Sequence, residues 1–179
     1  MIHTHCGLIG LLSCTLLAGC SGWQSVSLGS DDPCASLQAV VADYPDGFAS
    51  YRGKASSYNL LTVYRAKEQL VSGHCEIWAW DQTDAAYACN LNAPNAEVAE
   101  QRWQKTDQFV QQCLGADWER TEFSRERNGD AAGNGSRYAP PQGEPVVSVH
   151  SISRSGGPRT QRTTSLYIGS PARVDKLTE

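Results

Sequence analysis

The chain lacks the residue patterns by which most enzyme sites are recognised. Only four of its 179 residues are histidines, and two of these, His3 and His5, stand at the N-terminus. The sequence contains no Gly-x-Ser-x-Gly, Walker, His-Glu-x-x-His or Gly-x-Gly-x-x-Gly motif. We therefore expect that the protein is not an enzyme and that it holds no metal and no cofactor.

Long apolar runs are also scarce, and the one clear run lies near the N-terminus. Residues 7–18 are uncharged and mostly apolar, but this segment is too short to span a bilayer comfortably as a helix. The stretch Leu17-Ala18-Gly19-Cys20 resembles the lipobox of bacterial lipoproteins. The resemblance covers residues 1–22 and implies that residues 1–19 are a signal peptide. It also implies that Cys20 is the first mature residue and carries the lipid.

The resemblance further implies a place for the protein in the cell. Ser21 rather than Asp follows the cysteine, which in enteric-type bacteria implies an outer-membrane lipoprotein that faces the periplasm. Three acyl chains hold a protein far more firmly than one, so the anchor needs no transmembrane helix. The first five residues depart from the family pattern because they contain no Lys or Arg. An ordinary secretory signal is the alternative.

Cysteine pairs with the Cys-x-x-Cys spacing of zinc sites are absent. Of seven cysteines, three lie at or before Cys20. The other four are Cys34, Cys75, Cys89 and Cys113. An even number in an exported domain favours two disulfides, and the long, irregular spacings argue against a metal site.

The sequence favours one pairing of these cysteines without deciding it. Residues 75–89 predict a β-hairpin, and in the favoured register Cys75 faces Cys89 on the same face of the sheet. Cys34 then pairs with Cys113 by elimination and joins two helices. The alternative pairing ties each helix to one strand.

Two helices are predicted from capping residues and apolar spacing. The first begins at Asp32-Pro33, where Asp is a favourable N-cap and Pro a favourable first residue. The segment Pro45-Asp46-Gly47 ends or kinks this helix. The second covers residues 96–114, where apolar positions recur every three or four residues and Gly115 provides the stop.

Strands are predicted for much of the remaining chain. They are expected at about residues 60–68, 74–91, 117–126, 145–153 and 163–169. The segment 128–143 is rich in Gly, Asn and Pro and is expected to be a long loop. Residues 156–158 predict a turn, and residues 171–179 predict a loose tail.

The order of these elements predicts an α+β fold, namely an antiparallel sheet with two helices packed on one face and disulfides as braces. The order also fits a duplicated unit of one helix and three strands, although no residue-level repeat is visible. The sequence predicts a single domain over residues 34–170. A flexible tether over residues 20–33 joins this domain to the lipid.

Basic residues are scarce in the first part of the chain. Residues 21–119 carry six basic and thirteen acidic residues, whereas residues 120–179 carry nine and six. The net charge of −4 and the exported location argue against a nucleic-acid partner. Most C-terminal basic residues are Arg, which recognises carboxylates and phosphates. A solvated surface is the simpler interpretation.

Trp78 and Trp80 are candidate binding residues because the predicted hairpin places them opposite the cysteine-bearing face. Exposed tryptophans can stack on sugar rings or anchor a protein partner. Arg154, Arg159 and Arg162 are candidate partners in such a site. The alternative is that both tryptophans pack in the core.

These features predict a non-catalytic, outer-membrane-anchored lipoprotein whose periplasmic domain binds a protein partner. That partner is an envelope assembly factor or a toxin that the protein neutralises. The alternative is a lipoprotein that binds a glycan or another anionic envelope ligand. A hydrolase of peptidoglycan or lipid is a third hypothesis, since paired carboxylates such as Asp81 and Asp84 can cleave glycans. However, Asp residues at turns usually cap the backbone.

Overall fold

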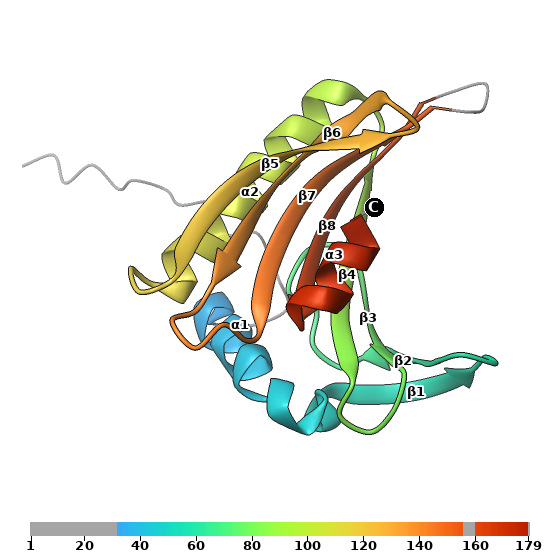
Figure 1. The fold of residues 1–179 in the computed structure, drawn as a ribbon, viewed down its shortest axis with the longest axis vertical. Coiled ribbons are helices and arrows are strands. Elements are labelled where there is room, and N and C mark those ends of the chain that lie inside the picture. The colour runs from blue at the N-terminus through green and yellow to red at the C-terminus, as the bar shows by residue number, and fades with distance from the viewer. Residues whose placement is uncertain (1–31, 156–159, 179) are drawn as a thin grey trace, which may run out of the picture.

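Eight strands of the described residues pair into one antiparallel sheet, and helices lie beside it. The computed structural model describes residues 32–155 and 160–178 and has an α+β fold (Figure 1). The strand order is β1-β2-β3-β4-β8-β7-β6-β5. The strands are β1 Arg52–Ser57, β2 Thr62–Ala66, β3 His74–Ala79, β4 Ala85–Ala93, β5 Glu119–Arg127, β6 Asp130–Ala139, β7 Val146–Arg154 and β8 Gln161–Gly169.

The helices begin where capping side chains satisfy free backbone N–H groups. The elements are α1 Pro33–Ala42, α2 Ala96–Leu114 and α3 Pro171–Thr178, with short 3-10 helices at Tyr44–Asp46 and Ala49–Tyr51. Asp32 accepts a hydrogen bond from the N–H of Ala35 at 3.0 Å. Asn95 accepts one from the N–H of Val98 at 2.8 Å. The predicted starts of the first two helices are therefore confirmed.

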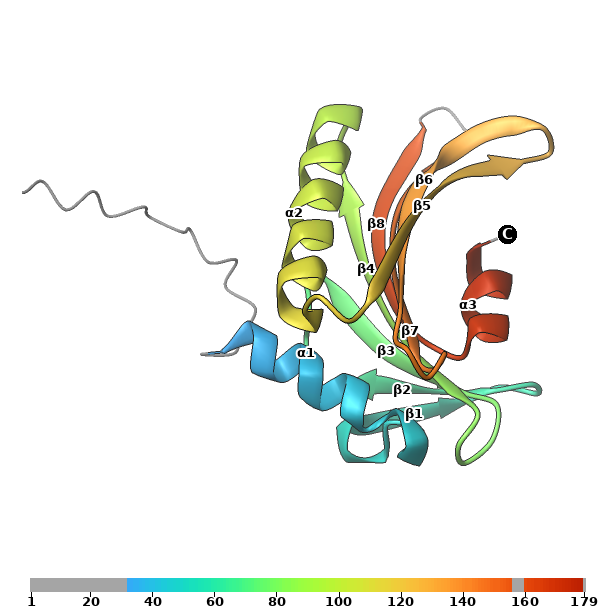
Figure 2. The same cartoon turned by 60° about the vertical axis from the view of Figure 1, so that its left-hand side comes forward.

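The main core is made of residues from the sheet and from the first two helices. Helix α2 contacts β4, β7 and β8, and it also contacts α1. Helix α3 contacts β7 and β8 and lies on the opposite side of the sheet from α2 (Figure 2). The core includes Leu37 and Val40 of α1, Val110 of α2, and Ile77 and Leu166 of the sheet, all completely buried.

The favoured disulfide pairing is confirmed. Cys75 and Cys89 are directly opposite each other in β3 and β4, as the predicted register requires, and they form one disulfide. Cys34 and Cys113 form the other, across α1 and α2. The alternative, in which each helix is tied to a strand, does not occur.

The segment 128–143 differs from the long loop that its composition predicted. Most of it is strand β6, which pairs with β5 and β7. Asn128 and Gly129 form the connection from β5, with φ angles of 55° and 82°. Positive φ at both residues is typical of a two-residue type I′ hairpin, for which Asn-Gly is the strongest local signal. The Gly, Asn and Pro content of the segment predicted a loop, whereas the Asn128-Gly129 dipeptide indicates a hairpin turn.

The C-terminal segment also differs from its prediction, because residues 171–178 form α3 where a loose tail was expected. Pro171 starts the helix favourably, and the carbonyl of Ser170 accepts hydrogen bonds from the N–H groups of Arg173 and Val174 at 3.1 and 3.0 Å. Val174 is only 1% exposed, so the helix is held by packing against the sheet. The predicted turn at 156–158 lies outside the described residues.

Each of the first two helices precedes four antiparallel strands. Helix α1 is followed by β1–β4 and α2 by β5–β8, and the last strands of the two sets, β4 and β8, pair at the centre of the sheet. The sequence had suggested three strands after each helix. The additional strands are β1 and β6.

Candidate interaction site

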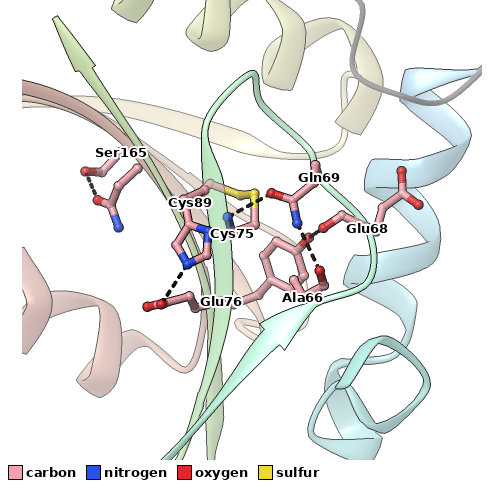
Figure 3. Close-up of a disulfide and its surroundings, with 10 residues drawn as sticks. Ala66, Glu68, Gln69, Cys75, Glu76, Cys89 and Ser165 are labelled. Atoms are coloured by element: carbon pink, nitrogen blue, oxygen red, sulfur yellow. Dashed lines mark hydrogen bonds and ion pairs between the residues drawn. A yellow bond between two sulfur atoms is a disulfide. The ribbon is translucent and has the colours of Figure 1, made fainter. Parts of the chain in front are cut away.

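The Cys75–Cys89 disulfide joins β3 to β4, and Gln69 holds the loop between β2 and β3 beside it. Both cysteines are completely buried, and their Cα atoms are 4.0 Å apart. Gln69 accepts a hydrogen bond from the N–H of Cys75 at 2.9 Å and donates one to the carbonyl of Ala66 at 2.9 Å (Figure 3). Leu70, the next residue, is 1% exposed. These contacts give the disulfide and Gln69 a structural role.

The two candidate tryptophans lie on the opposite face and are partly covered. Trp78 is half-buried against a cluster that includes Val174 of α3, and it donates its Nε1–H to Glu76 at 2.9 Å. The guanidinium of Arg173 lies 3.9 Å from the ring centroid of Trp80. Both rings are therefore partly covered by neighbouring side chains and do not form an open pair.

The candidate arginines are placed away from these tryptophans. Trp78 and Arg162 pair with positions of β4 that are seven residues apart, which corresponds to about 23 Å along a strand. Arg154 is exposed at the end of β7. Arg159 and the lipidation candidate Cys20 lie outside the described residues. The structure thus does not bring Arg154 or Arg162 to the two tryptophans.

An exposed apolar tip on the β1–β2 hairpin was missed by the sequence reasoning. Tyr58 is 66% exposed and Leu60 82% exposed, and no other large hydrophobic side chain in the described residues is classed as exposed. The hairpin extends beyond the body of the sheet (Figures 1 and 2). The N–H of Tyr58 donates to the carbonyl of Leu61 at 2.9 Å and closes the turn. We call Tyr58 and Leu60 the hairpin tip.

The base of this hairpin is held firmly by Arg52. Its guanidinium donates to the carbonyls of Gly47 at 2.8 Å and Gln82 at 2.9 Å, and it lies 4.9 Å from the ring centroid of Tyr64. Strand β1 is also at one edge of the sheet. The hairpin tip is therefore carried by a braced element and not by an irregular loop.

A buried carboxylate, that of Asp107, accepts hydrogen bonds from neighbouring side chains at both oxygens. Asp107 of α2 is 6% exposed and accepts hydrogen bonds from Arg120 at 2.6 Å and from the Tyr138 hydroxyl at 2.7 Å. Burial and the hydrogen bond to Asp107 raise the pKa of Tyr138. This network joins α2 to β5 and β6, and its satisfied partners indicate a structural role.

His150 lies on the other sheet face and is completely buried. A guanidinium only donates hydrogen bonds, so the Nη1 of Arg125 donates to Nδ1 of His150 at 3.1 Å. The ring proton is therefore on Nε2, which donates to Ser148 Oγ at 2.8 Å. Burial, together with the charge of Arg125, lowers the pKa of His150 to about 3. Both nitrogens are occupied, which leaves His150 poorly suited to acid–base catalysis or metal binding.

Residues 32–155 and 160–178 were also searched for membrane-spanning helices and for groups of metal-binding side chains. No helix there is long and apolar enough to cross a membrane, and no three His, Cys, Asp or Glu side chains are grouped so that they could hold a metal ion. Comparisons with protein families, curated proteins and solved structures found no match to this chain.

Proposed function

We propose that the protein is a non-catalytic lipoprotein that is anchored to the outer membrane through Cys20 and binds a protein partner in the periplasm. The observation that carries this proposal is the exposed hairpin tip, Tyr58 and Leu60. The resemblance of residues 17–20 to a lipobox supports the anchor. The partner is an envelope assembly factor or a toxin that the protein neutralises.

The hairpin tip has the properties of a binding anchor. Burying a large apolar side chain contributes roughly 1.5–3 kcal/mol, and a few well-buried side chains dominate most protein interfaces. Because Arg52 braces the base of the hairpin, we expect the hairpin to lose little conformational freedom when it binds. A preorganised element loses less conformational entropy when it docks.

The proposal includes the finer organisation of the domain. We propose that α1 and α2 form one layer on the cysteine-bearing face and that the chain repeats a helix-plus-strands unit. The contacts of α2 with β4, β7 and β8 support the layer, as does the Cys34–Cys113 disulfide. In this arrangement both helices pack against the core, and the hairpin tip remains exposed and available to bind the partner.

Two other functions receive less support. A glycan site across Trp78, Trp80, Arg154 and Arg162 would need residues that lie apart, and Arg173 of α3 already covers the Trp80 ring. A hydrolase would need a free acid or base. His150 has both nitrogens engaged.

The first test is site-specific photo-crosslinking of the full-length lipoprotein in its own bacterium. A benzophenone amino acid in place of Tyr58 should capture one envelope protein. The purified partner should bind the unmodified protein, and the double substitution Tyr58→Ser with Leu60→Ser should weaken that binding at least tenfold, because both anchors are lost.

The matched control is Lys54→Ser, an exposed change on the same hairpin that should leave the affinity unchanged. Equal affinity for the double variant and the unmodified protein would contradict the proposal. So would the absence of any crosslink.

A further inference from the structure

Arg125 is a buried cation without an acidic partner. It is 9% exposed, its Nη1 donates to the neutral ring of His150 at 3.1 Å, and its buried Nε has no hydrogen-bond partner. Among the ion pairs of residues 32–155 and 160–178, none involves Arg125. No carboxylate of the described residues is therefore ion-paired with its charge.

Other arginines of the molecule show what Arg125 lacks. Three arginines that are less buried than Arg125 each pair with a carboxylate: Arg120 with Asp107, Arg137 with Asp175 and Arg173 with Asp84. Arg125 is the most deeply buried of the described arginines and has no such ion pair.

The neighbours of Arg125 increase its need for an anion. Burial, with repulsion from Arg154 of β7, lowers the pKa of Arg125, and only the phenol of Tyr167 favours the charged form. A buried charge that lacks a partner is strongly destabilising. An anion that accepted a hydrogen bond from the unpartnered Nε would remove much of that penalty.

Aromatic rings line this region of the sheet. Phe123 and Tyr167 flank His150, with ring centroids 5.3 and 5.2 Å away. Phe123 lies directly over Gly135, where an added Cβ would be 2.5 Å from the ring. The rings pack around His150, which holds Nη1 of Arg125 by its hydrogen bond. The exposed Arg154 provides a second charge near the surface.

We propose that Arg125 and Arg154 form a binding site for an oxyanion, a carboxylate or phosphate group carried by an envelope molecule. The Nε and Nη2 groups of Arg125 would form the two parallel hydrogen bonds by which Arg binds such groups. This site is separate from the hairpin tip, because β5 and β1 are the opposite edges of the sheet. It does not depend on the proposed protein partner.

The test is the thermal stability of the oxidised protein with added anions. Inorganic phosphate and acetate are the probes, and sodium chloride at equal ionic strength is the reference. At about ten times the Kd, a bound anion should raise the Tm by roughly 3–6 °C. Inorganic phosphate and a muropeptide that carries a carboxylate are tested separately. The comparison distinguishes a phosphate source from a carboxylate source.

Two variants assign the effect to Arg125. Arg125→Met should lose the anion-dependent rise, and Arg125→Lys, which keeps the charge but not the paired donors, should bind at least tenfold more weakly. Arg137→Gln is the control, since Arg137 already pairs with Asp175, and it should keep the rise. No rise beyond that in chloride, or an equal rise in Arg125→Met, would overturn the proposal.

Discussion

At the scale of the residue, the neutral state of His150 links the pH to the stability of the fold. Its pKa is lowered to about 3 in the folded protein, whereas a histidine in an unfolded chain titrates near 6.5. Between these values the unfolded chain binds a proton that the folded protein does not. Stability therefore falls as the pH drops below about 6.5, by about 1.4 kcal/mol per pH unit.

Replacing His150 with Gln should remove this part of the pH dependence. Gln can still accept from Arg125 and donate to Ser148, but it does not titrate. Between pH 7 and pH 5 the unmodified protein should lose about 2 kcal/mol more than His150→Gln. Urea unfolding at the two pH values measures the difference. The same loss in both proteins would show that His150 titrates normally.

Some residue positions were predictable because their signal is local. The pairing of Cys75 with Cys89 follows from the two-residue period of strands, which the sequence displays directly. The burial of Arg125 depends instead on residues of distant strands, such as His150 of β7 and Tyr167 of β8. No local sequence pattern therefore reveals it. Leu60 was expected to begin a strand at about residues 60–68, but Tyr58 and Leu60 lie in the turn between β1 and β2, where they are exposed.

At the scale of the element, α3 acts as a cover for part of the sheet. Val174 packs with Ala88, Val146 and Tyr167, and Trp78 lies beside this cluster. A helix of eight residues is too short to be stable in water without such packing. Its presence was therefore not readable from capping or periodicity, in contrast to the 19-residue α2.

Val174→Asp should detach α3 from the sheet, because a carboxylate would have to be buried without a partner. Trp78 should then become more accessible, which acrylamide quenching of tryptophan fluorescence measures, and the Tm should fall. Ala172→Asp is the control, since Ala172 is on the same helix but exposed. Equal quenching in the two variants would mean that Val174 does not hold the helix.

Strand β6 shows the limit of composition as a guide. Its Gly and Asn residues have low strand propensity, yet both of its edges pair with neighbours, and tertiary pairing overrides that preference. Its Gly135 is required for a packing reason, because the Phe123 ring occupies the space of a side chain.

At the scale of the whole molecule, the disulfides brace the chain over different lengths. Cys34 and Cys113 are 79 residues apart, and Cys75 and Cys89 are 14 apart. A cross-link over a longer loop restricts the unfolded chain more. The bridge between the helices should therefore contribute more stability than the bridge within the hairpin.

Paired substitutions test this order. Cys34→Ala with Cys113→Ala should lower the free energy of unfolding by about 4.5 kcal/mol, and Cys75→Ala with Cys89→Ala by about 3 kcal/mol. Urea unfolding in the absence of reductant measures both. A larger loss from the second pair would show that the local contacts of the buried hairpin disulfide outweigh chain entropy.

The meeting of β4 and β8 at the centre of the sheet sets the order in which the chain can fold. Ser165 of β8 donates to Asn90 of β4 across 75 residues of sequence. Contacts between such distant residues form slowly, and β4 remains an unpaired edge until β8 has been synthesised. Unpaired edges invite association with other chains. A product that terminates before residue 161 is therefore expected to aggregate or be degraded, and not to persist as a smaller folded domain.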